Sequence, residues 1–352
     1  MNQIVVPTGY MGSGSSAITN ILSEITGYDQ NKGEFEFVMM HCPDGLFDLE
    51  DKLLMGNNAL RSDEAIHRFM LCMKELYCKK NYWVSGYREK VSCLFYQHCQ
   101  EFISEICDFN IRDSYWYYQQ KPDTLYIQLI NYIRRFLGKI SLGIIRLERP
   151  VKYKDMRISF TDSEKFYVCS KKFLACIFKD LGLDRHNLVL DQFLLPHNLF
   201  RIEHYFGADL RVIVVERDPR DIFLLNKYVW KPQGVAVPFP LDVHKFINFY
   251  KKMRNMEKNQ NDKRIMRIHF EDLIYKYEET LNDLYDFLGI EAIQHVRKGS
   301  IFLPSRSIIN TQIFTTNIIY YDEISVMEEQ LKEFLYPFPK INIERSDLHD
   351  VF

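Results

Sequence analysis

Short apolar runs alternate with amphipathic segments over both ends of the chain, and this pattern predicts strands that alternate with helices. The apolar runs are typical of buried parallel strands, whereas the segments between them repeat apolar residues at helical spacing. We therefore expect an α/β fold in three layers, a parallel sheet with helices on both faces. The expected strands cover residues 3–8, 34–40, 187–190, 210–215 and 263–268, and the expected helices cover residues 17–26, 199–206, 221–228, 241–259, 277–288 and 321–335.

The middle of the chain, from about residue 59 to residue 181, follows a different pattern. Its amphipathic segments predict a run of helices, and a strand-like pattern of residues predicts one β-hairpin among them. We interpret this stretch as a mostly helical insertion or lid in a single domain that spans residues 1–352, and such segments often determine which acceptor is bound. The helices are expected at residues 59–80, 90–107, 124–139 and 163–181, and the hairpin at residues 144–160.

Composition narrows the class of protein. The chain has 352 residues, of which 47% are hydrophobic, and its 45 Lys and Arg against 47 Asp and Glu give a net charge of -2. A chain of this kind can bury a large core, which excludes intrinsic disorder and a disulfide-stapled miniprotein. The balanced charge argues against a protein that coats nucleic acid, because such binding needs a basic face to neutralise many phosphates.

The eight cysteines form no Cys-x-x-Cys pair and no Cys/His cluster at zinc spacing. We expect them to be free, buried thiols, and we expect no metal site. The sequence opens without the charged and apolar regions of a signal peptide. No apolar run approaches the roughly 20 residues that span a bilayer. We therefore expect a cytoplasmic protein with no membrane span.

The first candidate for chemistry is a glycine motif between an expected strand and an expected helix. Gly9-x-x-x-x-Gly14-Ser15-Ser16 is the phosphate-loop pattern, with Ser15 in the place of its lysine. Such a loop lets backbone N–H groups converge on an anion at a helix N-terminus, and this function does not need the lysine. Phosphoryl transfer depends on that lysine and on a magnesium ion. A plain Gly-Ser turn between strand and helix is the alternative interpretation.

The second candidate is an arginine at the end of the clearest strand. The apolar run Leu210–Val215 leads into Arg217-Asp-Pro-Arg-Asp221, followed by a helical pattern. An arginine at the carboxyl end of a parallel strand lies where ligands of such sheets bind, and it can hold a phosphate through two hydrogen bonds. A surface ion pair with Asp218 or Asp221 is the alternative role for Arg217.

With both motifs in the same chain, the sequence resembles the sulfotransferases that use 3′-phosphoadenosine 5′-phosphosulfate, which have a phosphate-loop fold, and in particular their bacterial, carbohydrate-type members. The resemblance covers roughly residues 1–30 and 187–300 and includes Phe270-Glu-Asp-Leu273. It implies that this nucleotide is the sulfuryl donor, that no metal is required and that the acceptor is a glycan or a small molecule. It also implies that the 3′-phosphate is held by Arg217 with Asn226, Arg297 or Lys298, and that the 5′-phosphosulfate is held by Tyr10, Met11, Gly12, Ser13, Gly14, Ser15, Ser16 and Ala17.

The chain departs from the family pattern at three positions. Gly12 stands where many members have a basic residue, and Leu225 stands where they have a serine that binds the 3′-phosphate. Phe270 replaces a common tyrosine, which keeps a ring for the adenine and loses a hydroxyl. These departures leave open whether the activity is retained.

The acceptor hydroxyl must lose a proton as the new O–S bond forms, so a carboxylate or imidazole is expected within reach of it. Asp191, at the end of an expected strand, is the first candidate, and His197 is the second. Asp191 could instead cap the following helix or bind a metal. Glu34 and Glu36 could contact acceptor or cofactor, although their alternation with phenylalanines equally fits a half-exposed strand.

Three functions follow from these residues. The first is sulfuryl transfer to a hydroxyl or amine, with Asp191 orienting or deprotonating the acceptor. The second is a phosphate-loop kinase or NTPase that uses ATP and magnesium, with Ser16 on the metal and Asp191 or Glu216 as the acidic strand-end residue. The third is a non-catalytic binding protein with a degenerate nucleotide loop.

Overall fold

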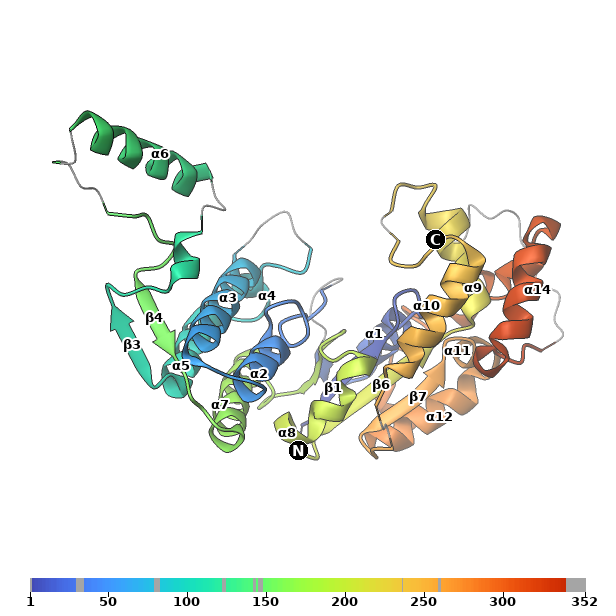
Figure 1. Ribbon diagram of the computed structural model, residues 1–352. Coiled ribbons are helices and arrows are strands. Elements are labelled where there is room, and N and C mark those ends of the chain that lie inside the picture. The colour runs from blue at the N-terminus through green and yellow to red at the C-terminus, as the bar shows by residue number, and fades with distance from the viewer. Residues whose placement is uncertain are drawn as a thin grey trace.

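Five parallel strands form the central sheet of the computed structural model, in the order β2-β5-β1-β6-β7. β1 lies in the middle, where Val5 is level with Val189 of β5 on one side and with Arg211 of β6 on the other. The expected parallel sheet with helices on both faces is confirmed (Figure 1). The strands are β1 (Ile4–Gly9), β2 (Tyr28–Asp29), β5 (Asn187–Val189), β6 (Leu210–Glu216) and β7 (Ile265–His269). The structure describes residues 2–29, 35–78, 83–121, 125–141, 144, 148–235, 237–258 and 261–339.

Both faces of the sheet are buried, because successive side chains of a strand point to opposite sides. In β6, Val212 and Val214 pack into a larger core on one face. Ile213 and Val215, the residues between and after them, pack into a smaller core on the other face. This explains why the strand is a continuous apolar run in the sequence rather than an alternating one.

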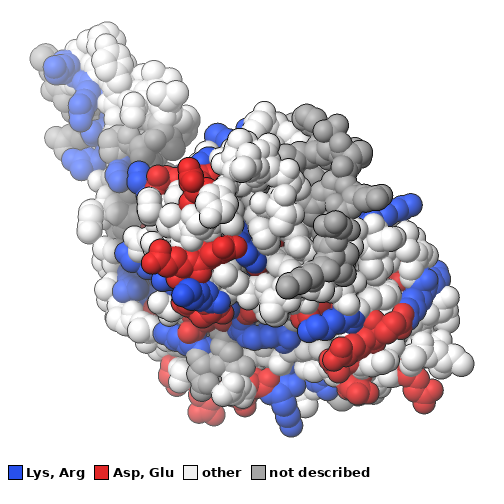
Figure 2. All heavy atoms as spheres, turned by 90° about the vertical axis from the view of Figure 1, so that its right-hand side faces the viewer, with Lys and Arg blue, Asp and Glu red and all other residues white. Residues whose placement is uncertain are grey.

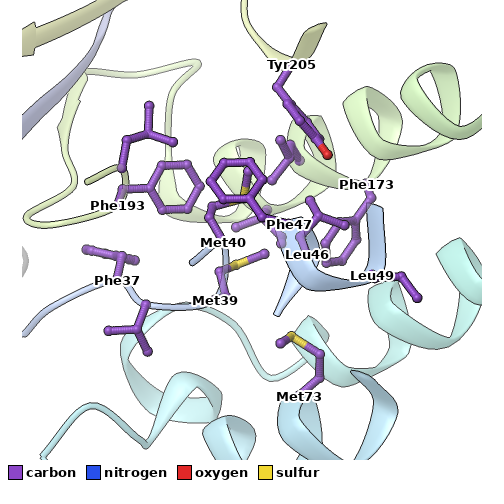
Figure 3. Packing of buried hydrophobic residues seen from close by; sticks show 14 of the residues in the cluster. Phe37, Met39, Met40, Leu46, Phe47, Leu49, Met73, Phe173, Phe193 and Tyr205 are labelled. Carbon is purple, nitrogen blue, oxygen red and sulfur yellow. The ribbon is translucent and has the colours of Figure 1, made fainter. Parts of the chain in front are cut away.

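The larger core joins the sheet to most of the helices in the first half of the chain. Phe37, Met73 and Phe173 come from three separate segments and meet in this core, as Figure 3 shows. Within the expected insertion, α3, α5 and α7 share this core with β1 and β6. The elements on this side are α2 (Leu46–Leu54), α3 (Ala59–Tyr77), α4 (Tyr87–Lys90), α5 (Phe95–Ile106), α7 (Ser163–Leu181), η2 (Pro196–Arg201) and α8 (Ile202–Tyr205).

The smaller core and a third apolar cluster hold the remaining helices. α1 (Ser16–Ser23), α11 (Asp272–Tyr275) and α12 (Tyr277–Leu288) cover the second face of the sheet. The third cluster packs α9 (Pro219–Leu224), the π-helical turn η3 (Leu225–Trp230), α10 (Val243–Asn255) and α14 (Tyr321–Gln330) against one another. Short helices complete this side: η4 (Ala292–Gln294), α13 (Pro304–Ser307), η5 (Ile308–Asn310), η6 (Ile313–Thr315), η7 (Ile318–Tyr320) and η8 (Lys332–Phe334).

Two expected β-elements are wrong. The strand expected at residues 34–40 is absent from its described part, residues 35–40, and the second strand of the chain is β2 instead. The hairpin expected at 144–160 is absent from its described part, residues 144 and 148–160, where β4 (Asp155–Ile158) instead pairs antiparallel with β3 (Phe109–Arg112). The helices η1 (Tyr117–Gln120) and α6 (Leu125–Ile140) lie between these two strands in the sequence.

Two further expectations concern the cysteines and the membrane. All eight cysteines are free, but only Cys99 and Cys169 are buried and Cys93 is exposed, so the expectation of buried thiols is wrong for most of them. Within the described ranges, none of the helices combines the length and the apolar character needed to cross a bilayer.

Candidate active site

The glycine loop connects β1 to α1 at the carboxyl edge of the sheet, and its backbone requires glycine at two positions. Gly12 and Gly14 have φ angles of +83° and +85°, which L-residues rarely adopt. A Cβ atom at Gly14 would lie 2.7 Å from the ring of Phe270, and one at Gly12 would lie 3.2 Å from the ring of Trp230. The loop is therefore more than a flexible connection, since two aromatic rings pack directly against its backbone.

A cavity of about 410 Å³ opens above this loop. It brings together residues from both sequence motifs and from the end of β5. Among the residues predicted to form the site, those that line it are Tyr10, Met11, Gly12, Gly14, Ser15, Ser16, Ala17, Asp191 and Arg217. Ser13 is buried beneath the loop, where its N–H donates to the carbonyl oxygen of Tyr10 at 2.8 Å.

Arg217 is anchored at the wall of this cavity. Its side chain is 4% exposed, and its Nη1 donates to the carbonyl oxygen of Gly12 at 2.9 Å. Its Nη2 donates to the carbonyl oxygen of Asn310, and the guanidinium lies 4.8 Å from the ring centre of Phe270. Nε has no hydrogen-bond partner among the described residues. The expected proximity of residue 217 to the glycine loop is thus confirmed.

The other charged residues of the 217–221 motif have structural roles. Asp218 caps α9 by accepting from the N–H of Arg220, and it also forms an ion pair of 2.8 Å with that arginine. Asp221 accepts from the N–H groups of Gln312 at 2.8 Å and Ile313 at 2.7 Å. These carboxylates are thus occupied elsewhere, and the alternative of a surface ion pair for buried Arg217 is wrong.

Burial lowers the pKa of Arg217, and the negative charges of Asp221, Glu271 and Asp218 act in the opposite direction. Asp221 and Glu271 are themselves buried, which raises their pKa to about 7 and about 8, respectively. An arginine stays protonated at neutral pH even where burial lowers its pKa, so the buried guanidinium of Arg217 carries a positive charge. Such a charge interacts strongly with an anion that enters the cavity.

Two carboxyl groups face the cavity from the side of β5. Burial, and next the charge of Glu36, raise the pKa of Asp191 to about 7. Burial also raises the pKa of Glu36, which lines the same cavity. Asp191 Oδ1 has no hydrogen-bond partner within the described ranges. The alternative role of Asp191 as a helix cap is wrong, because the next helix, η2, begins at Pro196 and is not capped by a side chain.

Gln192 is a site residue that the sequence analysis missed. Its Nε2 donates to Ser15 Oγ at 2.9 Å, while its Oε1 accepts from Thr8 Oγ1 at 3.1 Å. Gln192 has a φ of +56°, which is uncommon for a residue with a side chain. It therefore fixes the hydroxyl of Ser15, the residue that replaces the phosphate-loop lysine. The available signal was its position directly after the end of an expected strand.

The sequence indicated three other residues of the cavity lining poorly. It did not predict Trp230 or Asn310, and it offered Glu36 only as a possible contact to acceptor or cofactor. Trp230 ends the π-helical turn η3, where a regular helix was expected to end at residue 228. Asn310 comes from a segment that the sequence showed only as irregular, and it lines the cavity close to Gln312 and Ile313, whose N–H groups Asp221 holds. Glu36 had the weak signal of alternating with phenylalanine. Glu34 lies outside the described residues.

His197 and Asn226 do not line the cavity. His197 packs edge-on against the ring of Tyr10 with 5.5 Å between the ring centres, and burial lowers its pKa. Asn226 is buried, and its Nδ2 donates to the carbonyl oxygen of Ile222 at 2.8 Å.

Arg297 and Lys298 lie farther along the chain and likewise do not line the cavity. Arg297 donates to the carbonyl oxygen of Ser23 in the last turn of α1. Lys298 forms an exposed ion pair of 2.6 Å with Glu278. The structure therefore does not bring the Arg297-Lys298-Gly299 tripeptide to the glycine loop.

A buried carboxylate explains where this segment goes instead. Glu24 accepts hydrogen bonds from the N–H groups of Gly299, Ile301 and Phe302, at 3.0, 2.6 and 2.8 Å. It also bonds to His295 Nε2 at 2.8 Å. Burial acts to raise the pKa of Glu24, but these hydrogen bonds outweigh it, and the pKa is lowered. The hydrogen bonds to Glu24 fix the position of Phe302, which lines the cavity.

The profile of a family described as the sulfotransferase family matches residues 5–294. No curated protein matches the sequence.

Three solved structures are similar over almost the whole chain. The sulfotransferase domain from the curacin biosynthetic pathway is 13% identical, with 96% of this chain and 93% of that chain covered and a TM-score of 0.39. The sulfotransferase domain from the olefin synthase of Synechococcus PCC 7002 is 10% identical, with coverages of 96% and 95% and a TM-score of 0.41. A sulfotransferase from Mycobacterium avium is 13% identical, with coverages of 97% and 78% and a TM-score of 0.34.

Proposed function

Because the chain belongs to the sulfotransferase family, we propose that it transfers a sulfuryl group from 3′-phosphoadenosine 5′-phosphosulfate to a hydroxyl or amine of a carbohydrate. The contact between Arg217 and Gly12 supports this choice of donor, because a buried cation then lies beside a glycine loop of the kind that binds anions. The carbohydrate acceptor is proposed from the resemblance in sequence alone.

The donor's two anionic ends would be held by different elements. The loop amides, with the hydroxyls of Ser15 and Ser16, would hold the 5′-phosphosulfate at the N-terminus of α1, where the helix dipole favours negative charge. Arg217 would hold the 3′-phosphate, and its Nε, a buried donor without a partner among the described residues, fits a phosphate oxygen. The rings of Phe270 and Trp230 flank the loop and would contact the base. Asn226, Arg297 and Lys298 lie outside the cavity lining and have no part in this proposal.

Asp191 would receive the acceptor's proton. As the acceptor oxygen forms its bond to sulfur, the S–O bond to the nucleotide phosphate breaks, the proton passes to Asp191, and the 3′,5′-bisphosphate leaves. A general base works best when its pKa is close to the working pH, and burial next to Glu36 gives Asp191 such a pKa. His197, behind Tyr10, is the less suitable of the two predicted bases. Catalysis would otherwise come from positioning and from donors to the developing charge.

The kinase alternative loses one of its candidate metal ligands. Glu216 Oε1 accepts from Arg254 at 2.8 Å and from Arg267 at 2.7 Å. A carboxylate held by two arginines is poorly suited to bind magnesium. Together with Ser15 in the place of the lysine, this favours sulfuryl over phosphoryl transfer.

Thermal unfolding with different nucleotides tests the proposal. Adenosine 3′,5′-bisphosphate at 100 times its dissociation constant should stabilise the protein by about 2.7 kcal/mol, and AMP at the same concentration should do much less. Stabilisation by ATP with magnesium alone would support a kinase, and no stabilisation by any of these would support a binding protein without catalysis. Transfer of labelled sulfate from the donor to a panel of glycans then identifies the acceptor.

A further inference from the structure

Helix α6 presents an apolar face to solvent. Six of its large hydrophobic residues are more than half exposed, namely Leu125, Tyr126, Leu129, Tyr132, Phe136 and Ile140. Five of them recur every three or four residues and so form one stripe along the helix. Ile127, on another side of the helix, is buried. In Figure 1, α6 stands apart from the sheet and its covering helices at the upper left.

The charges of this region have one sign. From residue 124 to residue 147 the sequence contains Arg134, Arg135, Lys139 and Arg146 and no Asp or Glu, although the whole chain carries a net charge of -2. On the helix, Arg135 and Lys139 are one turn apart and border the apolar stripe. Figure 2 shows blue basic side chains among white ones on the lobe at the upper left, which contains α6.

A second copy of the chain is a poor partner for this face. A helix of 16 residues is about 24 Å long, so its outer side offers only one short helix face. A stable protein interface needs about 800 Å² from each partner. Pairing two copies through α6 would also bring Arg135 and Lys139 of both copies together, and like charges oppose such contact.

We propose that α6 docks the protein on the surface of an anionic lipid membrane. Helices that lie in the membrane interface combine a wide apolar face with Lys and Arg on the polar face, and they need no matching protein surface. The stripe from Leu125 to Ile140 would enter the boundary between headgroups and acyl chains. Arg135 and Lys139 would lie level with the lipid phosphates, and Tyr126 and Tyr132 suit the same depth because their rings are apolar and their hydroxyls polar. The inference does not depend on the reaction that the cavity catalyses.

Sedimentation with lipid vesicles tests this docking on the full-length protein. We expect binding to vesicles of phosphatidylcholine with phosphatidylglycerol, weaker binding to pure phosphatidylcholine, and a loss of the difference at high salt. The double variant Leu129→Asp/Phe136→Asp should abolish binding. Arg135→Gln/Lys139→Gln should lower the partition coefficient about fivefold for each charge removed.

Matched variants separate docking from a general change in the surface. Ile293 and Ile318 are 80% and 87% exposed and lie far from α6 in the sequence, so Ile293→Asp/Ile318→Asp should bind vesicles like the unchanged protein. Unchanged melting temperatures would show that the α6 variants are folded. Absence of vesicle binding by the unchanged protein would overturn the proposal. A dimer in solution that dissociates when α6 is changed would also overturn it. Vesicle binding that persists in the α6 variants would do the same.

Discussion

Asp191 and Glu36 are neighbouring carboxyl groups, and the charge of Glu36 affects the pKa of Asp191. Each is partly withdrawn from water at the cavity, and the negative charge of Glu36 is the second cause, after burial, of the raised pKa of Asp191. The ionised form of Asp191 is therefore costly in the folded protein and is available as a base only near or above neutral pH. This coupling can be measured.

We predict that kcat/KM rises with pH through about 7, because Asp191 must lose its proton before it can act as a base. Glu36→Gln removes the neighbouring charge and so lowers the pKa of Asp191, which should move this limb of the pH profile to lower pH. Asp191→Asn should cut kcat about a hundredfold or more and leave bisphosphate affinity nearly unchanged. A pH profile that does not move in Glu36→Gln would contradict the pairing.

Arg217 should determine recognition of the 3′-phosphate. Arg217→Ala removes a charged donor, and we expect bisphosphate affinity to fall about 10- to 100-fold, which corresponds to about 1.5–3 kcal/mol. Arg217→Lys keeps the charge but loses the two guanidinium nitrogens that reach Gly12 and Asn310. The bisphosphate affinity of this variant should therefore be intermediate.

Isothermal titration with adenosine 3′,5′-bisphosphate and with adenosine 5′-phosphosulfate measures this effect. The second ligand lacks the 3′-phosphate and should lose much less affinity. Arg211→Ala is the control, because Arg211 lies near the other end of β6 and donates to the carbonyl oxygen of Phe287. Equal losses for both ligands would contradict the role of Arg217.

The sequence predicted single residues well where one local motif determines their position. Arg217 and the glycine loop both follow apolar strands, and the carboxyl ends of neighbouring parallel strands meet at one edge of the sheet. Arg297 and Lys298 were expected at the nucleotide only because a tripeptide matched, and their actual position depends on Glu24, which is about 270 residues away in the sequence. No local pattern shows such a contact.

At the scale of elements, two buried carboxylates position the segments that close the cavity. Asp221 holds the backbone after Asn310, and Glu24 holds the backbone before and at Phe302. Asp221 lies in α9 and Glu24 is the C-cap of α1, and each accepts hydrogen bonds from N–H groups of an irregular segment that would otherwise be left without partners in the interior. Segments with little regular structure thereby acquire defined positions.

Glu24→Gln should destabilise the protein by about 2–4 kcal/mol, because an amide cannot accept all the hydrogen bonds that the buried carboxylate accepts. Urea denaturation measures the change. The lowered pKa of Glu24 means that this contribution is present at neutral pH and is lost as the pH falls and the group is protonated, so the two proteins should converge in acid. Glu278→Gln, at an exposed ion pair with Lys298, should change stability by less than about 0.5 kcal/mol.

Helices were predicted more accurately than β-elements, and α7 and α12 have the expected bounds. Their apolar residues recur over several turns, which makes the period clear. The strand expected at 34–40 fails because both Phe35 and Phe37 are buried without strand pairing, while the N–H of Phe37 donates to the carbonyl oxygen of Asp191. β3 was not predicted from the sequence, because its partner β4 lies more than 40 residues later in the chain.

At the scale of the whole molecule, two separate surfaces should respond to two separate ligands. The cavity joins the glycine loop to Asn310, whereas α6 lies in the insertion and does not line that cavity. Ligands should therefore protect different segments from hydrogen exchange.

We expect the bisphosphate to slow amide exchange in residues 10–17 and 302–310 and to leave residues 125–141 unchanged. Anionic vesicles should slow exchange in residues 125–141 alone. Hydrogen-exchange mass spectrometry of the full-length protein measures both patterns. Protection of all three segments by either ligand would show that the two surfaces are coupled, contrary to this prediction.

The central place of β1 has a consequence for synthesis on the ribosome. Both neighbours of β1 follow residue 186, and β6 begins only at Leu210. At about 5–20 residues per second, the ribosome needs roughly 10–40 s to make the chain between β1 and β6. During that time the apolar strand that carries the glycine loop lacks β6, with which it makes most of its pairs, and until β5 is made it has no partner strand. Nascent chains arrested before residue 210 should therefore expose β1 to chaperones and proteases, and those arrested after β7 should not.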